Sequence, residues 1–191
     1  MKVYAVNGSA RREGNTKRLL SMVCAELETE GIETEIASLA GKQVGGCIGC
    51  GKCGEKKNRR CVFDNDPANL HIGKMDQADG ILLGSPVYFS DMSANMKGLV
   101  ERAGMVSRQN GYMFERKPGA PVVAVRRAGA NHTIASINYF FLISSMIVVG
   151  SSYWNMAIGR EAGEVEKDEE GVGIMRDLGK NMAWLLKKIN G

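Results

Sequence analysis

Histidine is scarce in this sequence. Only His71 and His132 occur among 191 residues, far apart and with no metal-ligand pattern around either. We therefore expect both to be structural or surface residues. No Ser-His-Asp arrangement and no catalytic pair of carboxylates is apparent, so the sequence gives no support to hydrolysis by such groups. Their absence is compatible with an enzyme whose cofactor supplies the reactivity while the protein supplies binding and electrostatics.

Long hydrophobic runs are also lacking. The longest, residues 139–149, is interrupted by Ser144 and Ser145 and is shorter than the about 20 residues that span a bilayer. The apolar stretch at residues 3–6 is too short for a signal peptide. We expect a cytoplasmic protein without a membrane partner, in which thiols stay reduced and clustered cysteines indicate metal or redox chemistry rather than disulfides. A net charge of +4 is too small to indicate nucleic-acid binding.

Patterns typical of strands and helices alternate along the chain. This alternation and the length predict a single α/β domain over residues 1–191, with a parallel sheet covered by helices on both faces. A cysteine-bearing loop insertion at about 41–65 and irregular segments at 105–119 and 155–170 interrupt it. The expected strands are residues 2–6, 32–39, 80–84, 120–125 and 147–153. Two expected helices begin at Thr16 and Pro67, two span residues 94–104 and 133–146, and the last begins near Val172.

The loop after the first strand, residues 7–16, has the composition of an anion site. Free N–H groups at a helix N-terminus attract anions. Ser9, Asn15 and Thr16 add short donors, and Arg11 or Arg12 adds positive charge. The loop lacks the Gly-Lys-Ser/Thr motif of nucleoside triphosphatases, which argues against ATP or GTP, and it lacks the G-x-G-x-x-G motif of dinucleotide-binding proteins. It therefore suits a phosphate monoester, although a polar turn with a helix cap explains it equally well.

Two further loops follow the third and fourth strands. In residues 84–93, a proline sets a turn and Tyr88 and Phe89 lie at the edge of the sheet, where they could pack on a flat heterocycle or into the core. Residues 126–131 form the third loop. Because ligands of open α/β sheets bind outside the carboxyl ends of the strands, we expect the three loops to share one site.

Four cysteines form the sharpest local pattern, C-x2-C-x2-C-x7-C, at Cys47, Cys50, Cys53 and Cys61. This compact spacing suits a [4Fe–4S] cluster, although four thiolates can also hold zinc, and free or oxidisable thiols are the third alternative. Valine follows the last cysteine, where ferredoxin-type motifs have proline. The fifth cysteine, Cys24, lies in the first helix and is expected to be buried and inert.

The cysteine loop is also basic, with Lys56, Lys57, Arg59 and Arg60. These cations could dock an acidic electron carrier such as ferredoxin, or offset the charge of four thiolates. A solvated basic loop without a partner is the simpler interpretation.

Taken together, these motifs resemble the NADPH-dependent FMN reductase and iron-sulfur flavoprotein group. The resemblance lies in the Gly-Ser-x4-Gly-Asn-Thr pattern, in Ser-Pro-Val-Tyr-Phe followed by Asn-Met-Lys, and in residues 168–171 and 178–181, so it covers nearly the whole chain. It implies a flavodoxin-like three-layer sandwich with a five-stranded parallel sheet of order 2-1-3-4-5.

The resemblance also implies a set of site residues. The FMN phosphate would be held by Ser9, Arg11, Gly14, Asn15 and Thr16, the isoalloxazine ring by Pro86, Val87, Tyr88 and Phe89, and its pyrimidine side by Arg127, Ala128 and Gly129. In iron-sulfur flavoproteins a compact cysteine motif carries a [4Fe–4S] cluster, whereas other relatives bind FMN alone. By that match, Cys47, Cys50, Cys53 and Cys61 would be the ligands.

The function expected from these features is an FMN-dependent oxidoreductase that passes electrons from NAD(P)H or ferredoxin to a small acceptor such as flavin, quinone or oxygen. An electron-transfer protein without its own organic substrate is the main alternative, and a flavin- or metal-dependent sensor is another. The apolar run 139–143 predicts a homodimer or homotetramer, unless it is simply a buried core helix.

Overall fold

A parallel sheet forms the centre of the computed structural model, which describes all 191 residues. Its main order is β2-β1-β3-β4-β5, which confirms the predicted arrangement. The order reverses between β1 and β3, so a site is expected above the carboxyl ends of these strands. The strands are β1 (Lys2–Asn7), β2 (Glu33–Ser38), β3 (Gly80–Pro86), β4 (Pro118–Val125), β5 (Ile147–Val148) and β6 (Met156–Ile158).

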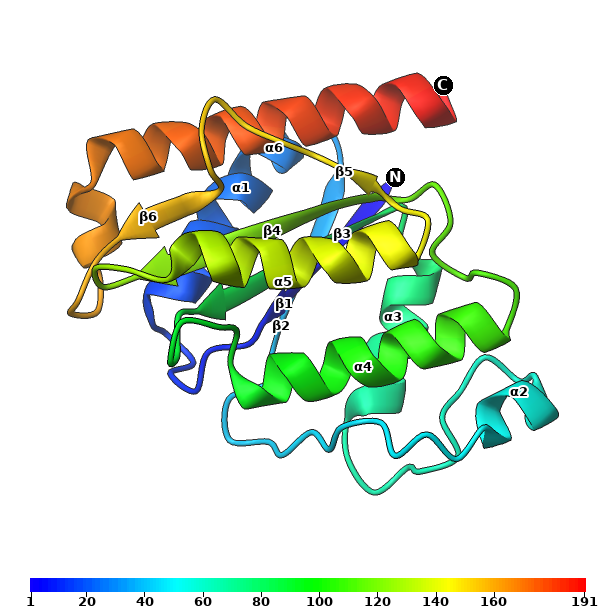
Figure 1. Cartoon of the computed structure of the whole chain (residues 1–191). Helices are drawn as coiled ribbons and strands as arrows, with labels where there is room; N and C mark the ends of the chain where they lie inside the picture. Colours follow the sequence, from blue (N-terminus) through cyan, green and yellow to red (C-terminus); the bar gives the residue numbers. More distant parts are fainter.

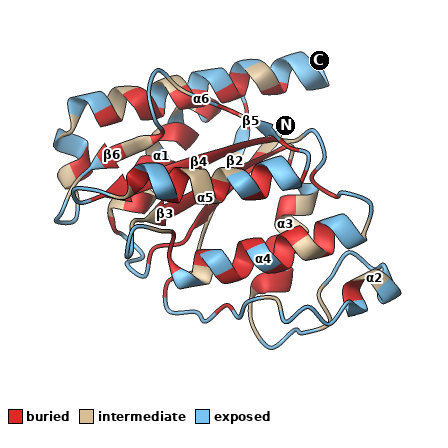
Figure 2. Ribbon diagram, viewed as in Figure 1, coloured by how far each residue is buried: buried red, intermediate tan, exposed pale blue.

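Helices cover both faces of the sheet (Figure 1). Helices α1 (Asn15–Thr29) and α6 (Glu169–Asn190) pack on one face; α3 (Ala68–Gln77), α4 (Ala94–Gln109) and α5 (Ala130–Ile143) pack on the other. Side chains alternate between the two resulting cores: Val3 of β1 faces α1 and α6, whereas Tyr4 faces the opposite layer. The central strands β1, β3 and β4 are accordingly buried on both faces, as Figure 2 shows, whereas the outer strands β2, β5 and β6 are partly exposed.

The edge of the sheet differs from the prediction. A continuous strand at 147–153 is wrong: β5 has two residues, and β6 pairs with the other end of β4 in a segment expected to be a loop. Residues 149–155 leave the edge because side chains fasten a turn there. Ser151 Oγ donates to Asn155 Oδ1 at 2.7 Å, and Asn155 Nδ2 donates to the carbonyl of Val149 at 3.3 Å.

Four helical segments also differ from the prediction. Helix α4 continues through Gly104 to Gln109, and Gly104 lies against the ring of Phe140 on α5. The expected helix 133–146 begins and ends three residues earlier. The short helices α2 (Lys52–Lys56) and η1 (Glu164–Lys167) lie in segments expected to be loops. None of the helices has the length and apolarity that crossing a membrane requires.

Candidate functional site

The first loop is folded tightly onto the end of β3. The N–H of Gly8 donates to the carbonyl of Gly84 at 2.8 Å, and the N–H of Arg11 donates to Ser9 Oγ at 3.1 Å. The chain then turns back at Gly14, whose N–H donates to the carbonyl of Arg11 at 3.2 Å. Ser9 is buried at this turn, directly before α1 begins.

The N-terminus of α1 has donors without partners. The hydroxyl of Thr16 is buried, with the residue 1% exposed, and makes no hydrogen bond. The first N–H groups of any α-helix have no intrahelical acceptor. Here no side chain caps the helix and its first turn holds no acidic residue, so no side-chain acceptor replaces it. An anion placed here would satisfy both the hydroxyl and the N–H groups. The residues present therefore fit a phosphate group.

The side chain of Asn15, predicted to contact the phosphate, forms hydrogen bonds within the chain. Its amide donates to the carbonyls of Gly159 at 3.2 Å and Glu161 at 2.9 Å, and its oxygen accepts from the N–H of Gly163 at 2.7 Å. The side chain thus fastens the segment after β6 beside the first loop. Arg11 is exposed on the same loop, with its guanidinium free of ion pairs.

The second loop ends in a tight turn that displays an aromatic ring. Tyr88 and Asp91 exchange backbone hydrogen bonds at 2.8 and 3.0 Å, and the two residues between them, Phe89 and Ser90, have φ values of 49° and 64°. Left-handed backbone at a non-glycine aromatic residue is unusual and clusters at functional sites. The side chain of Phe89 is fully exposed and that of Tyr88 about half exposed. Neither packs into the core, which was the alternative left open by the sequence.

The three loops form one continuous edge. Ser93 Oγ donates to the carbonyl of Gly8 at 2.6 Å and so joins the second loop to the first. Gly129 of the third loop has φ +90°, and a Cβ there would lie 2.9 Å from both Ser90 Cα and Val87 Cγ1. The residues predicted to hold phosphate, ring and pyrimidine therefore lie along the carboxyl edge of β1, β3 and β4. Arg127, Ala128 and Gly129 also line a neighbouring cavity of about 410 Å³.

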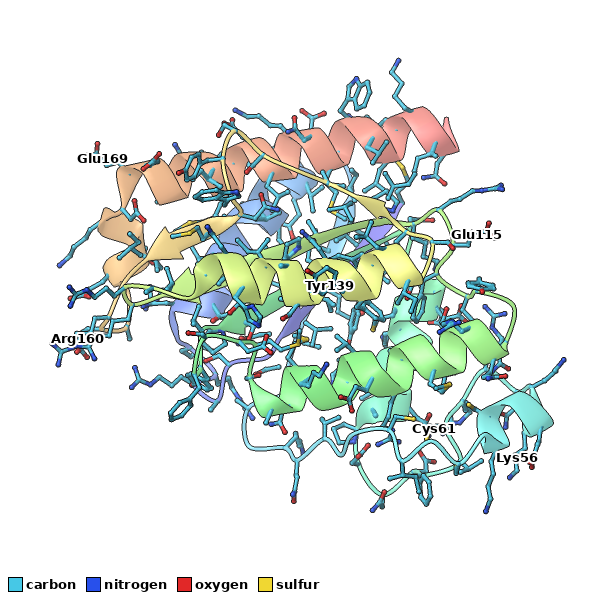
Figure 3. The ribbon with its side chains drawn as sticks, viewed as in Figure 1. Lys56, Cys61, Glu115, Tyr139, Arg160 and Glu169 are labelled. Atoms are coloured by element: carbon cyan, nitrogen blue, oxygen red, sulfur yellow. The ribbon has the colours of Figure 1, made fainter.

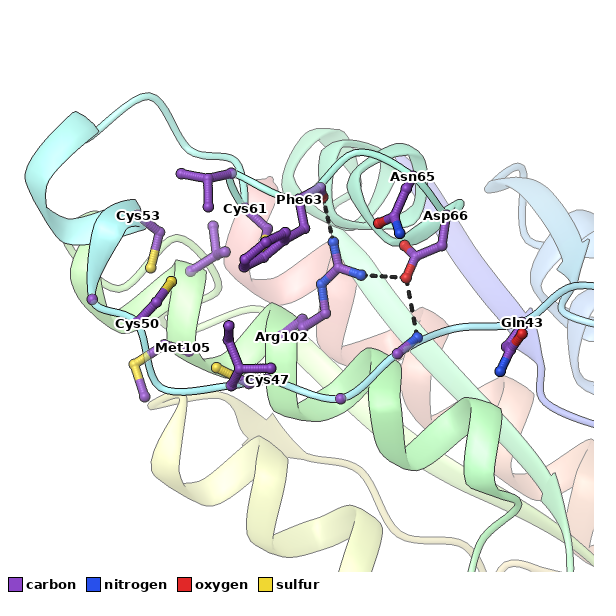
Figure 4. Close-up of a pocket in the computed structure, with 16 residues that line it drawn as sticks. Gln43, Cys47, Cys50, Cys53, Cys61, Phe63, Asn65, Asp66, Arg102 and Met105 are labelled. Atoms are coloured by element: carbon purple, nitrogen blue, oxygen red, sulfur yellow. Dashed lines mark hydrogen bonds and ion pairs between the residues drawn. The ribbon is translucent and has the colours of Figure 1, made fainter.

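A second cavity, of about 400 Å³, lies between the cysteine segment and α4 (Figure 4). All four predicted ligands line it: Cys53 is buried, Cys47 and Cys61 are intermediate, and Cys50 is exposed. Left-handed Gly49 and Gly51 make the tight turns between the first three cysteines.

The four thiols do not form a finished metal site, because no three cysteine, histidine or acidic side chains converge as ligands. Neighbouring cysteines nevertheless affect the pKa of the Cys53 thiol. Its pKa is raised, mainly by burial and further by Cys61 and Cys47, against the opposite effect of backbone N–H groups. A bound cation would reverse this penalty on the thiolate. The donor set fits a metal centre.

Two asparagines fix the cysteine segment in place. Asn69 on α3 accepts from the N–H of Cys61 at 2.8 Å and donates to the carbonyls of Cys61 and Phe63 at 3.0 and 3.1 Å. Asn110, which follows α4, accepts from the N–H of Arg59 at 2.9 Å and donates to the carbonyl of Cys53 at 3.3 Å. Sequence reasoning missed both residues, since a side chain that bonds a distant backbone leaves no local pattern.

A buried ion pair between Arg102 and Asp66 also attaches the cysteine segment to α4. Arg102 of α4 donates to Asp66 Oδ2 at 2.5 Å and to the carbonyl of Phe63 at 2.6 Å, and Asp66 also accepts from the N–H of Gly45 at 3.0 Å. Burial acts to raise the pKa of Asp66, but the N–H groups of Ala68 and Gly45 and the guanidinium of Arg102 together lower it. The carboxylate is therefore held charged against Arg102. Sequence reasoning also missed Arg102.

The basic residues of the segment divide into two kinds. Arg59 pairs with Asp76 on α3, and Arg60 pairs with Asp64. Lys56 and Lys57 are exposed and have no ion-pair partner. Figure 3 shows Lys56 at the tip of the segment, pointing into solvent. Two of the four cations therefore form ion pairs within the chain, and the two lysines are left to interact with solvent or a partner.

The apolar run on α5, residues 139–143, contains both buried and exposed side chains. Phe140 and Phe141 are buried, whereas Tyr139, Leu142 and Ile143 are exposed. Tyr139 and Ile143 line a groove of about 320 Å³ between α4 and α5. The buried-helix alternative accounts for only part of the run.

Comparison with known proteins gives consistent matches. Residues 1–161 match the family model described as NADPH-dependent FMN reductase. An iron-sulfur flavoprotein of Methanocaldococcus jannaschii is 40% identical over 196 residues, covering 99% of both chains. One from Methanosarcina thermophila is 29% identical over 197 residues, covering 99% of this chain and 97% of its own.

Solved structures support the fold. RosB, crystallised with 8-demethyl-8-formylriboflavin-5'-phosphate, superposes with a TM-score of 0.77 at 17% identity, over 99% of this chain and 80% of its own. An archaeal flavodoxin superposes with a TM-score of 0.64 at 15% identity, over 98% of this chain and 99% of its own. At these identities the likeness concerns the fold alone, and that fold is flavodoxin-like.

Proposed function

The chain belongs to the NADPH-dependent FMN reductase family, and we propose that it is an FMN-dependent oxidoreductase with a [4Fe–4S] cluster, which passes electrons from NAD(P)H or ferredoxin to a small acceptor. The main supporting observation is that four cysteines line one cavity in the same chain as the three flavin loops. Relatives that match the whole chain are named iron-sulfur flavoproteins.

The residues of the first loop have the task of binding the FMN phosphate. Thr16 Oγ1 and the free N–H groups of α1 supply neutral donors, and exposed Arg11 supplies charge. Asn15 acts indirectly, by holding residues 159–163 beside the loop.

The second and third loops bind and orient the ring. Phe89 and Tyr88 are exposed aromatic side chains at the rim, and Gly129 permits close approach of the two loops. FMN, when bound, supplies the capacity to take up electrons in a pair and release them singly. The protein contributes binding, orientation and electrostatics.

The alternative, an electron-transfer protein without an organic substrate, is favoured by Lys56 and Lys57, whose exposed and unpaired charges suit an acidic carrier. Steady-state oxidation of NADPH by the purified holoprotein separates the two. Turnover with NADPH and a quinone supports the oxidoreductase; reduction by ferredoxin with no NADPH turnover supports the carrier.

Thr16→Val is expected to weaken FMN binding by about 10- to 150-fold, because a hydrogen bond to a charged group is worth about 1.5–3 kcal/mol. Fluorescence quenching during titration with FMN measures the effect, and riboflavin, which has no phosphate, should be bound equally by the variant and the parent. Thr29→Val, at the other end of α1, is the matched control. If the parent binds riboflavin as tightly as FMN, the phosphate assignment is wrong.

Tyr139→Glu is expected to convert a homo-oligomer to monomers, because it places a charge among the exposed apolar residues of α5. Light scattering at micromolar concentration in the presence of FMN measures the mass. Ile189→Glu, at an exposed apolar position near the end of α6, should leave the mass unchanged. A parent protein that is monomeric under these conditions contradicts the predicted homodimer or homotetramer.

A further inference from the structure

The cavity of about 410 Å³ lies beside β6, between the first turns of α5 and α6 (Figure 1). It is lined by residues 127–132 and by parts of the segments 153–158 and 168–174, but by no residue of the first or second loop. The third loop borders both sites, since Gly129 also lies against Ser90 of the second loop. A ligand in this cavity would therefore be a neighbour of the proposed flavin, and the volume suits a small organic molecule.

Two consecutive aromatic side chains, Tyr153 and Trp154, line the cavity with their ring centroids 4.6 Å apart. They are 54% and 51% exposed, although aromatic rings contribute some of the largest gains on burial. Half-exposed aromatic rings in a concave site are suited to packing on a flat ligand.

The break in the edge of the sheet allows both rings to line the same cavity. In a regular strand, consecutive side chains point to opposite faces. Here the turn is fixed at both ends: Asn181 of α6 donates to the carbonyl of Gly150 at 2.9 Å, and the carbonyl of Asn155 accepts from the N–H of Val123 in β4 at 3.0 Å. The two rings are thus presented by an anchored part of the backbone.

The charges around the cavity favour an uncharged ligand. Arg127 and Glu170 are exposed and form no ion pair, so one free cation accompanies one free anion. Asp168 is occupied, because its carboxylate accepts from the N–H groups of Ile158 at 2.7 Å and Gly171 at 3.0 Å. A nicotinamide dinucleotide, with its several negative charges, would meet no surplus of positive charge here.

We propose that this cavity binds a flat, uncharged aromatic electron acceptor of the quinone class. The acceptor ring packs on Tyr153 and Trp154 beside the apolar side chains of Met156 and Ile174, and an acceptor oxygen takes a hydrogen bond from Arg127. This inference rests on the proposed function. The quinone gains two electrons and two protons from fully reduced flavin and leaves as the hydroquinone, while the flavin returns to its oxidised form.

Trp154→Ala removes the larger of the two rings, and Trp184→Ala is the matched control. The chain has only these two tryptophans, and Trp184 is 63% exposed on α6 without lining the cavity. Trp184→Phe leaves Trp154 as the single tryptophan, so its fluorescence reports on the cavity alone.

The experiment measures the binding of menadione, a naphthoquinone, to the oxidised FMN-loaded proteins by equilibrium dialysis. The dissociation constant should rise about tenfold in Trp154→Ala, because the ring that packs on the quinone is lost, and should not change in Trp184→Ala. Menadione should quench the fluorescence of Trp184→Phe with the parental dissociation constant, and ADP, a charged adenine probe, should not compete.

A parent that binds no menadione, or a Trp154→Ala variant that binds it as tightly as the parent, overturns the site and leaves the oxidoreductase function standing. Competition by ADP overturns the uncharged class of ligand. If menadione binds through Trp154 but the reduced holoprotein does not reduce it, the binding site stands and the oxidoreductase function falls. If Trp154→Ala does not fold by circular dichroism, Trp154→Leu, which keeps apolar bulk without a ring, decides instead.

Discussion

Replacement of Cys50 by alanine is expected to abolish uptake of iron and sulfide almost completely. The parent should bind about four irons per chain after anaerobic reconstitution, because Cys47, Cys50, Cys53 and Cys61 line one cavity. Removing one thiolate leaves an iron without a protein ligand. Cys50 is the suitable position because it is exposed, so its loss disturbs little packing.

The matched control is Cys24→Ala. Cys24 is 3% exposed within α1, and burial raises the pKa of its thiol to about 12, so it is not expected to act as a ligand. This variant should keep its iron, and both variants should keep FMN. One zinc per chain in the parent, or no metal after reconstitution, would contradict the cluster and leave an FMN reductase whose thiols serve another purpose.

Gly98→Ala is expected to displace the cysteine segment from α4. A Cβ at Gly98 would lie 2.5 Å from the carbonyl oxygen of Val44 and 3.2 Å from the backbone of Gly45, and backbone cannot give way as a flexible side chain can. We expect a loss of about 1–3 kcal/mol in the free energy of unfolding and reduced cluster content, despite the helix propensity that alanine adds. Chemical denaturation and iron analysis measure the two effects.

Gly173→Ala, which also replaces a glycine within a helix, is expected to stabilise the protein instead. Gly173 lies within α6, and no atom would come within 4 Å of a Cβ there. Alanine should therefore stabilise the protein by about 0.5–1 kcal/mol and leave its iron unchanged. If Gly98→Ala were as stable as Gly173→Ala, the close contact between the cysteine segment and α4 would be refuted.

Local patterns, namely apolar strands and the polar segments that follow their carboxyl ends, predicted the alternation of strands and helices and the three loops. The strand order, which is not a local property, came from the family resemblance. The prediction failed at the edge of the sheet. Ser151 and Asn155 break the last strand through a bond between their side chains and a bond from Asn155 to the backbone of Val149, and the three residues of β6 are too few to show a period.

The same limit applies to the candidate site. The spacing of the cysteines was visible in the sequence, but the residues that hold the segment were not. Arg102 looks like one more charged residue of a surface helix until the fold places it beside Phe63 and Asp66. The turn at Phe89 also went unforeseen, because no glycine or asparagine marks its left-handed positions.

The bonds of Asn15 have a consequence for the order in which the two sites form during synthesis. The first loop, which we propose binds the FMN phosphate, is fastened by residues 159–163, nearly 150 positions further along the chain, so it is complete only when translation is almost finished. The cysteine segment and its attachments all lie within residues 43–110. Since contacts between distant residues form slowly, the cysteine pocket can assemble on the emerging chain, whereas the flavin must await its release.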